Sequence, residues 1–73
     1  MSDVRTVDAR GLSCPQPVLL ARQAMTQMSK GSIEVLVDSG TSRDNVSRMA
    51  RKEGWQVTVT DAPGGEFRLV LTK

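Results

Sequence analysis

The sequence predicts a two-layer α/β (α+β) sandwich, in which two helices cover one face of a mixed four-stranded sheet. Two stretches with apolar residues at helical spacing are interleaved with short stretches in which apolar and polar residues alternate. A glycine-containing turn separates the last two alternating stretches. The expected order is therefore βαβαββ. Each helical connection favours parallel strands that are neighbours in the sheet, and a hairpin joins antiparallel ones, so we expect a mixed sheet.

The first half of the chain contains a strand, a helix and a second strand. Residues 4–8 form the first strand and residues 9–13 a connecting loop. A helix follows from Pro15 to about Met28, and residues 33–38 form a strand whose alternate apolar side chains face the helices. The buried stripe of this helix contains Val18, Leu20, Ala21, Ala24, Met25 and Met28, and the inward side chains of the strand are Ile33, Val35 and Val37.

A second helix follows a segment rich in turn and capping residues. Thr41 and Asp44 approximate a capping box at its start, and Gly54 is placed to end it. Its inward residues are expected to be Val46, Met49 and Ala50.

Two alternating stretches, 55–60 and 67–72, predict the last two strands. Residues 61–65 contain a proline and two glycines and predict the loop of a hairpin. The side chains expected to face the helices are Trp55, Val57, Val59, Phe67, Leu69 and Leu71. Both aromatic residues are therefore interpreted as parts of the core.

Length and composition indicate one small domain spanning residues 1–73. With 38% hydrophobic residues the chain can form a modest core. No apolar run is long enough to cross a membrane, and the first residues lack the apolar region of a signal peptide, so we expect a cytoplasmic protein. The net charge of +2 is too small to indicate nucleic-acid binding by itself.

The only cysteine, Cys14, lies immediately before the predicted start of the first helix. Pro15 suits the first helical position, because its fixed φ is helical and its missing N–H would have no partner there. The unpaired N–H groups of a helix N-terminus stabilise an anion and lower the pKa of a cysteine thiol. Pro17 lacks another N–H, which leaves that of Gln16 for the sulfur, so a moderate lowering is expected. Gly11 indicates a loop at the protein surface before this helix, so we expect Cys14 to be exposed. Cys14 is therefore a candidate nucleophile.

The residues that the chain lacks narrow the chemistry of this thiol. There is no histidine, no tyrosine and no second cysteine, so neither a Cys-His pair nor a Cys-x-x-Cys couple can form. A single thiolate with scattered carboxylates does not match a metal site, and we expect neither metal nor cofactor. Thiol exchange remains, in which the cysteine accepts a group and then passes it on.

Three further residues are auxiliary candidates near Cys14. Arg10 could stabilise an anionic persulfide or could instead pair with Asp8. Asp38 and Thr41 belong to the loop before the second helix, and they approach Cys14 if both helix N-termini share one edge of the sheet. The alternative role of Asp38 and Thr41 is helix capping.

Basic residues cluster on the second predicted helix. This group could dock an acidic partner or a phosphate backbone, or it could be a solvated helix face. Direct nucleic-acid binding is not favoured, because only two aromatic residues are available for stacking. The basic residues are Arg43, Arg48, Arg51 and Lys52.

Residues 7–17 contain the segment Cys14-Pro15-Gln16-Pro17, which resembles the Cys-Pro-x-Pro signature of the TusA/SirA-like sulfur-carrier family. Residues 35–48 resemble the N-terminal domain of YedF-like proteins, which are associated with selenium metabolism. The resemblance implies a sulfurtransferase-type carrier: Cys14 would take a persulfide sulfur from a cysteine desulfurase or a rhodanese-like donor and pass it to an acceptor protein. Gln16 and Ser13 differ from the acidic and basic residues of many tRNA-pathway members, so docking partners are expected to differ.

Two alternatives stay open beside the sulfur carrier. One is a selenium-metabolism or regulatory domain that uses the same thiol. The other is a protein- or RNA-binding module that works through the basic second helix. A carrier depends on partner proteins for both halves of the transfer, so the sequence does not decide whether the chain counts as an enzyme by itself.

Overall fold

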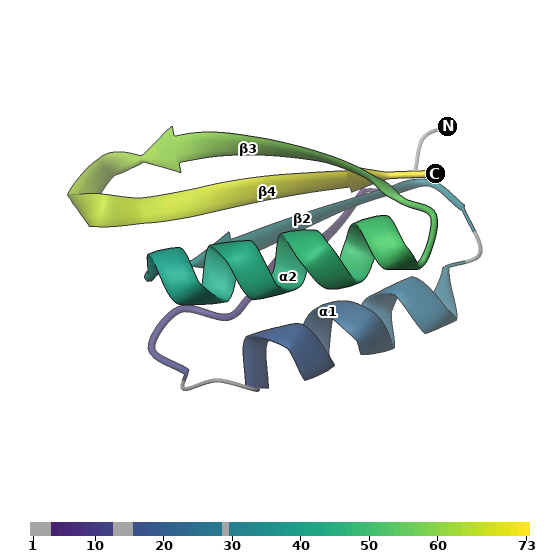
Figure 1. The fold of residues 1–73 in the computed structure, drawn as a ribbon, viewed down its shortest axis with the longest axis horizontal. Helices are drawn as coiled ribbons and strands as arrows, with labels where there is room; N and C mark the ends of the chain where they lie inside the picture. The colour runs from purple at the N-terminus through teal and green to yellow at the C-terminus, as the bar shows by residue number, and fades with distance from the viewer. Residues whose placement is uncertain (1–3, 13–15, 29) are drawn as a thin grey trace.

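The elements of the computed structural model follow the predicted order (Figure 1). The structure describes residues 4–12, 16–28 and 30–73. The elements are β1 (Val4–Asp8), α1 (Gln16–Gln27), β2 (Ser32–Val37), α2 (Gly40–Lys52), β3 (Gln56–Ala62), a single 3₁₀ turn (Pro63–Gly65) and β4 (Glu66–Thr72). Two helices on one face of a four-stranded sheet confirm the predicted α+β sandwich.

The strands are ordered β1-β2-β4-β3 across the sheet. β1 pairs with β2 in parallel, and β4 pairs antiparallel with both β2 and β3. The mixed sheet is confirmed, but the expectation that each helical connection joins neighbouring strands is wrong for the second one. β4 lies between β2 and β3 because its fully buried Leu69 and Leu71 belong at the centre of the sheet.

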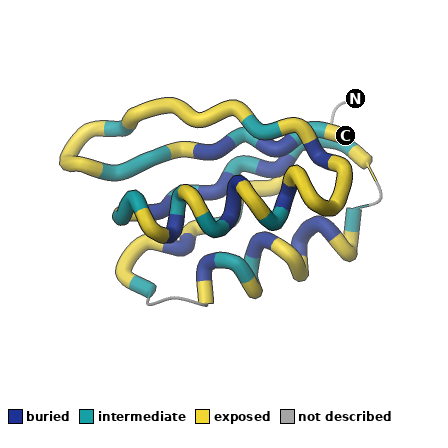
Figure 2. Tube along the Cα trace, viewed as in Figure 1, coloured by how far each residue is buried: buried dark blue, intermediate teal, exposed yellow. Residues whose placement is uncertain are grey.

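The core lies between the sheet and the two helices (Figure 2). In Figure 2 the buried positions of both helices face the sheet, and the central strands carry most of the others. The alternation predicted for β2 is confirmed, because Ile33, Val35 and Val37 are fully buried. The remaining buried apolar residues are Ala9, Ala21, Ala24, Met25, Val46, Ala50, Trp55, Leu69 and Leu71.

α1 buries the predicted stripe with one addition. Ala21, Ala24 and Met25 are buried, and Val18, Leu20 and Met28 pack partly buried against the core. Pro17 is also fully buried, although the sequence suggested only its missing N–H as a function. Its ring therefore anchors the start of α1 to the core.

The predicted cap of α2 is wrong. Ser39 is the N-cap, with extended backbone angles, and its hydroxyl oxygen accepts a 3.1 Å hydrogen bond from the N–H of Ser42. Thr41 is an exposed residue inside the first turn. A capping box spans three residues from the N-cap, and Ser42 is the residue at that distance from Ser39. The predicted end is confirmed by Gly54, whose φ of +88° suits a glycine after a helix.

The inward alternation predicted for residues 55–60 holds only in part. Trp55 is 5% exposed and precedes β3, Val57 is half-buried, and Val59 is 40% exposed. β3 is an edge strand, and its far end and the hairpin extend past the helices in Figure 1, so little covers Val59. Phe67, also assigned to the core, is half-buried under the Arg43 guanidinium, 4.5 Å from the ring centroid.

Neither described helix has the length and apolar character required to cross a membrane.

Candidate functional site

Cys14, Ser13 and Pro15 lie outside the described residues, so the structure defines the site by its two flanks. The first flank is the loop from β1 to Leu12, and the second is the start of α1 at Gln16. Both helix N-termini lie at the same end of the sheet (Figure 1), and there Asp38, after β2, contacts Gly11 in the first flank.

The first flank is tied to the sheet beyond the end of β1. The N–H of Ala9 donates a 2.8 Å hydrogen bond to the carbonyl oxygen of Leu36, and Ala9 is fully buried. The parallel pairing of β1 with β2 therefore continues for one residue before the chain turns, which fixes the origin of the loop.

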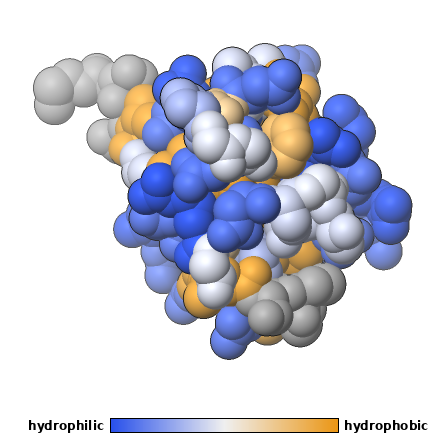
Figure 3. All heavy atoms as spheres, turned by 90° about the vertical axis from the view of Figure 1, so that its left-hand side faces the viewer, coloured by the Kyte–Doolittle hydropathy of each residue, from blue (hydrophilic) through white to orange (hydrophobic). Residues whose placement is uncertain are grey.

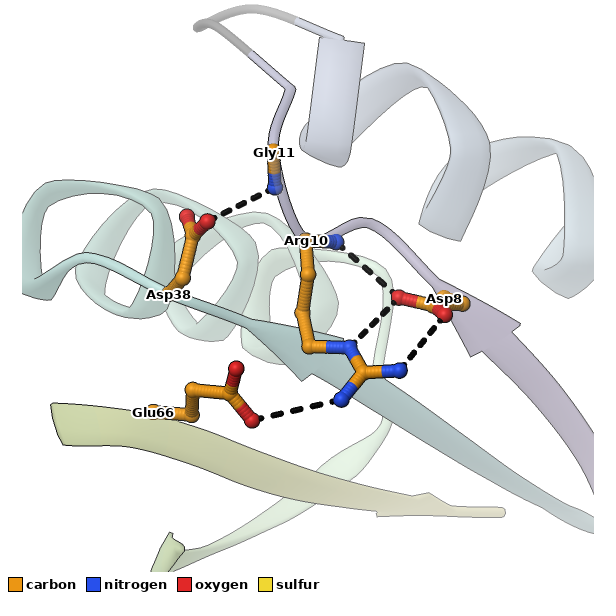
Figure 4. A network of polar contacts seen from close by, with 5 residues as sticks. All are labelled: Asp8, Arg10, Gly11, Asp38 and Glu66. Atoms are coloured by element: carbon orange, nitrogen blue, oxygen red, sulfur yellow. Dashed lines mark hydrogen bonds and ion pairs between the residues drawn. The ribbon is translucent and has the colours of Figure 1, made fainter. Parts of the chain in front are cut away.

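An ion-pair network of Asp8, Arg10 and Glu66 holds the turn itself (Figure 4). Two guanidinium nitrogens of Arg10 donate to the two carboxylate oxygens of Asp8, at 2.9 and 2.8 Å, and a third donates to Glu66 at 3.3 Å. The backbone N–H of Arg10 also donates to Asp8, at 3.1 Å. Such a two-pronged contact fixes the orientation of both side chains. Of the two roles that the sequence suggested for Arg10, the structure shows the pairing with Asp8.

This network shifts the pKa of both partners. The side-chain and backbone hydrogen bonds from Arg10 lower the pKa of Asp8 to about 2. The pKa of Arg10 is raised, mainly by its side-chain hydrogen bond to Asp8 and next by its hydrogen bond to Glu66. Both groups are therefore charged at neutral pH, and the turn keeps its ion pairs there.

The Asp8 shift gives a direct pH prediction. A lowered folded-state pKa contributes stability that is fully present above the ordinary value of 3.8 and is lost as pH falls through about 2. A ¹³C titration of the Asp8 carboxyl should show a midpoint near 2. Arg10→Ala should move the midpoint up towards 3.8. An equal midpoint in both proteins would contradict the assigned hydrogen bonds.

Gly11 links the loop to the end of β2. Its N–H donates a 2.7 Å hydrogen bond to the carboxylate of Asp38, the residue that directly follows β2 (Figure 4). Its φ is +77°, in the left-handed region that favours glycine. The structure thus brings Arg10, Gly11 and Asp38 together, and Asp38 acts on the loop and is not the cap of α2.

The second flank presents a mixed surface. Gln16 is exposed, Pro17 is buried, and Leu19 is 57% exposed. Figure 3 views this end of the molecule, where hydrophilic atoms predominate and hydrophobic atoms form small separate patches. Leu19 was not predicted as a site residue. Its only sequence signal is an apolar residue outside the buried stripe.

The other predicted residues lie apart from this loop. Thr41 is exposed in the first turn of α2. Arg43 and Arg48 line a groove beside β3, and none of the polar contacts described for the loop involves them. Within the described residues, no three histidine, cysteine, aspartate or glutamate side chains are grouped so that they could hold a metal ion.

The order of the elements and the mixed sheet define a small SirA-like α/β sandwich, and the comparison with solved structures agrees. A SirA-like protein from Desulfitobacterium hafniense has a crystal structure that superposes with a TM-score of 0.89 at 32% identity, over 96% of each chain. The family model described as Sulfurtransferase TusA matches residues 5–73, and the chain belongs to this family.

Curated relatives span the chain almost completely. The sulfur carrier protein TusA of Allochromatium vinosum is 30% identical over 69 residues, covering 92% of this chain and 90% of its own. A protein of Methanocaldococcus jannaschii that is provisionally named a sulfur carrier is 30% identical over 71 residues, covering 96% and 95%. The similarity therefore extends over more than nine-tenths of this chain.

Proposed function

We propose that the chain is a sulfur carrier in which Cys14 holds the transferred sulfur as a persulfide. The observation that carries this proposal is the position of the only cysteine, within Cys14-Pro15-Gln16-Pro17, in a member of the TusA family. Residues 1–73 would form a single carrier domain that works in the cytoplasm, where a free thiol stays reduced.

The transfer is a thiol exchange that needs no external oxidant or reductant. The Cys14 thiolate attacks the terminal sulfur of a donor persulfide, so a bond forms between Sγ and that sulfur. The sulfur–sulfur bond of the donor breaks, and its electron pair leaves with the donor thiolate. In the second half, an acceptor thiolate attacks the terminal sulfur on Cys14, and Cys14 leaves as the thiolate.

The flanks of Cys14 support this role. α1 is described from Gln16, two residues further along the chain, and the positive end of a helix favours a thiolate close by. On the other side, the Gly11–Asp38 hydrogen bond and the Arg10 network hold the loop in place up to the motif. We therefore expect an activated thiol on a segment anchored at both ends.

Donor and acceptor must supply what the chain lacks. With no histidine and no second thiol, the carrier needs a partner to deliver the sulfur and another to remove it. A cysteine desulfurase or a rhodanese-like protein is the expected donor, and a downstream protein thiol is the expected acceptor. Leu19, exposed near the start of α1, is an apolar contact available to such a partner.

A loading experiment tests this function. The purified chain is incubated with a cysteine desulfurase and cysteine, and in parallel with a rhodanese and thiosulfate, and its intact mass is measured. We expect a gain of one sulfur atom that a reductant removes. If the chain gained sulfur from neither donor, the proposal that it is a sulfur carrier would be rejected.

The backbone at Gly11 should matter for loading as well as for stability. Gly11→Ala places a side chain at φ +77°, and Gly64→Ala does the same at φ +78° in the hairpin; neither added Cβ meets an atom within 4 Å. Each change should lower the free energy of unfolding by about 1 kcal/mol. Only Gly11→Ala should slow loading, by several-fold, when stability and loading rate are measured together. Equal loading rates in the two variants would contradict a role for the loop.

A further inference from the structure

A groove runs between α2 and the edge of the sheet, on a part of the surface that the carrier chemistry does not use. It has a volume of about 550 Å³ and is lined by Arg43, Asp44, Ser47, Arg48, Arg51 and Val59. Five of these residues come from α2, and Val59 comes from β3. The groove is thus a channel between a helix and an edge strand.

The charges in the groove are unbalanced. Arg43 pairs with Asp44 at 3.0 Å and stacks on Phe67. Arg48 and Arg51 are exposed, and among the described residues neither has an ion pair or a hydrogen bond from its side chain. Two arginines without a counter-charge form a site for carboxylates or phosphates.

A buried hydroxyl lies in the same groove as these cations. Ser47 is 5% exposed, and its hydroxyl is buried with no hydrogen-bond partner among the described residues. A buried polar group without a partner costs free energy. Because Ser47 lines the groove, its hydroxyl is available as an additional donor for an anionic ligand.

The opposite wall favours an extended ligand. β3 is an edge strand that pairs only with β4 among the described strands, and Figure 2 shows most of its length exposed. An edge strand offers unpaired backbone groups to an added strand. Val59 faces the same side of the sheet as the buried Leu69 opposite it, so every second side chain of an added strand would point towards α2.

We propose that this groove binds an extended acidic segment of a partner protein, which pairs with β3 and directs its carboxylates to Arg48 and Arg51. A strand repeats its side-chain direction every second residue, which suits cations one helical turn apart on one side of α2. Single-stranded RNA is the less favoured occupant, because Trp55 is buried and Arg43 covers Phe67, so neither ring is open to a base.

The test uses a capped heptapeptide of alternating threonine and glutamate, with the glutamates replaced by lysine in a control peptide. Binding is followed by ¹⁵N NMR titration of the full chain, and a single-stranded oligouridine is titrated in parallel. We expect shifts at the β3 amides and the Arg48 and Arg51 Nε groups, with the glutamate peptide only, and weaker binding at higher salt. Failure of the glutamate peptide to bind, or tighter binding of oligouridine, would overturn the proposal.

Two neighbouring residues provide a matched pair of variants. Arg51 and Lys52 are both exposed in the last turn of α2, but only Arg51 lines the groove. Arg51→Glu should weaken peptide binding about tenfold, whereas Lys52→Glu should change it by less than about twofold. An equal loss in both would mean that only the overall charge matters. Cys14→Ser should bind the peptide normally, so the groove and the carrier function fail or succeed independently.

Ser47→Ala separates binding from folding. The change removes a buried hydroxyl that has no partner among the described residues, so the thermal midpoint should stay the same or rise. Peptide affinity should fall several-fold, because a donor is lost. A variant that binds the peptide as tightly as the original chain would remove Ser47 from the proposed site.

Discussion

Cys14→Ser is expected to abolish sulfur loading while leaving the fold unchanged. Serine has almost the shape of cysteine, but its hydroxyl is not a nucleophile without a general base, and the chain has no histidine to serve as one. No second thiol offers another route. Loading by a desulfurase, measured by intact mass, should therefore fall by at least about a hundredfold. The thermal midpoint should remain within a few degrees.

A second variant asks whether the position of the thiol matters. Thr60 is exposed on β3, so Cys14→Ser combined with Thr60→Cys restores one accessible thiol far along the chain from the motif. We expect loading of this double variant to stay close to that of Cys14→Ser. Loading at the rate of the original chain would show that any exposed thiol is sufficient, which contradicts a site at Cys14.

The sequence was most predictive where a local pattern and burial coincide. In β2, strict alternation placed Ile33, Val35 and Val37 on one face, and all three are fully buried. Gly54 predicted the end of α2, because a positive φ there favours glycine. In both cases a few neighbouring residues contain the whole signal.

Strand order was less predictable, because it depends on pairing between distant residues. β4 lies between β2 and β3. The apolar alternation of residues 55–60 does not indicate that β3 lies at the edge, where Val59 stays 40% exposed. The prediction of Thr41 as the cap was wrong for a different reason. Several residues near the start of α2 are of types that can cap a helix, and only the backbone angles show that Ser39 is the N-cap.

The site divides in the same way. The pairing of Arg10 with Asp8 involves residues two apart, and the sequence suggested it. Glu66 and Asp38 reach the loop only because β4 and β1 both pair with β2. Their contacts with the loop depend on the register of the sheet, and no pattern among neighbouring residues in the sequence predicts that register.

Leu71→Ala is expected to have the largest effect on stability. Leu71 is fully buried on the central strand β4, between Ile33 of β2 and Val57 of β3. Removing its side chain leaves a cavity in a small core, and such changes cost about 2–5 kcal/mol. In a chain of this size each kcal/mol lowers the thermal midpoint by roughly 4–8 °C. Thermal and urea unfolding should show a loss of most of the stability.

Leu19→Ala provides the matched control, because the same side chain is removed where it is 57% exposed. Its unfolding free energy should stay within about 0.5 kcal/mol of that of the original chain. Alanine is also the better helix former within α1. If the two variants lost stability equally, Leu71 could not lie in the core as described. If Leu19→Ala slowed sulfur loading at unchanged stability, the helix that carries this residue would still be intact. The slower loading would then show that the exposed Leu19 side chain contacts the partner.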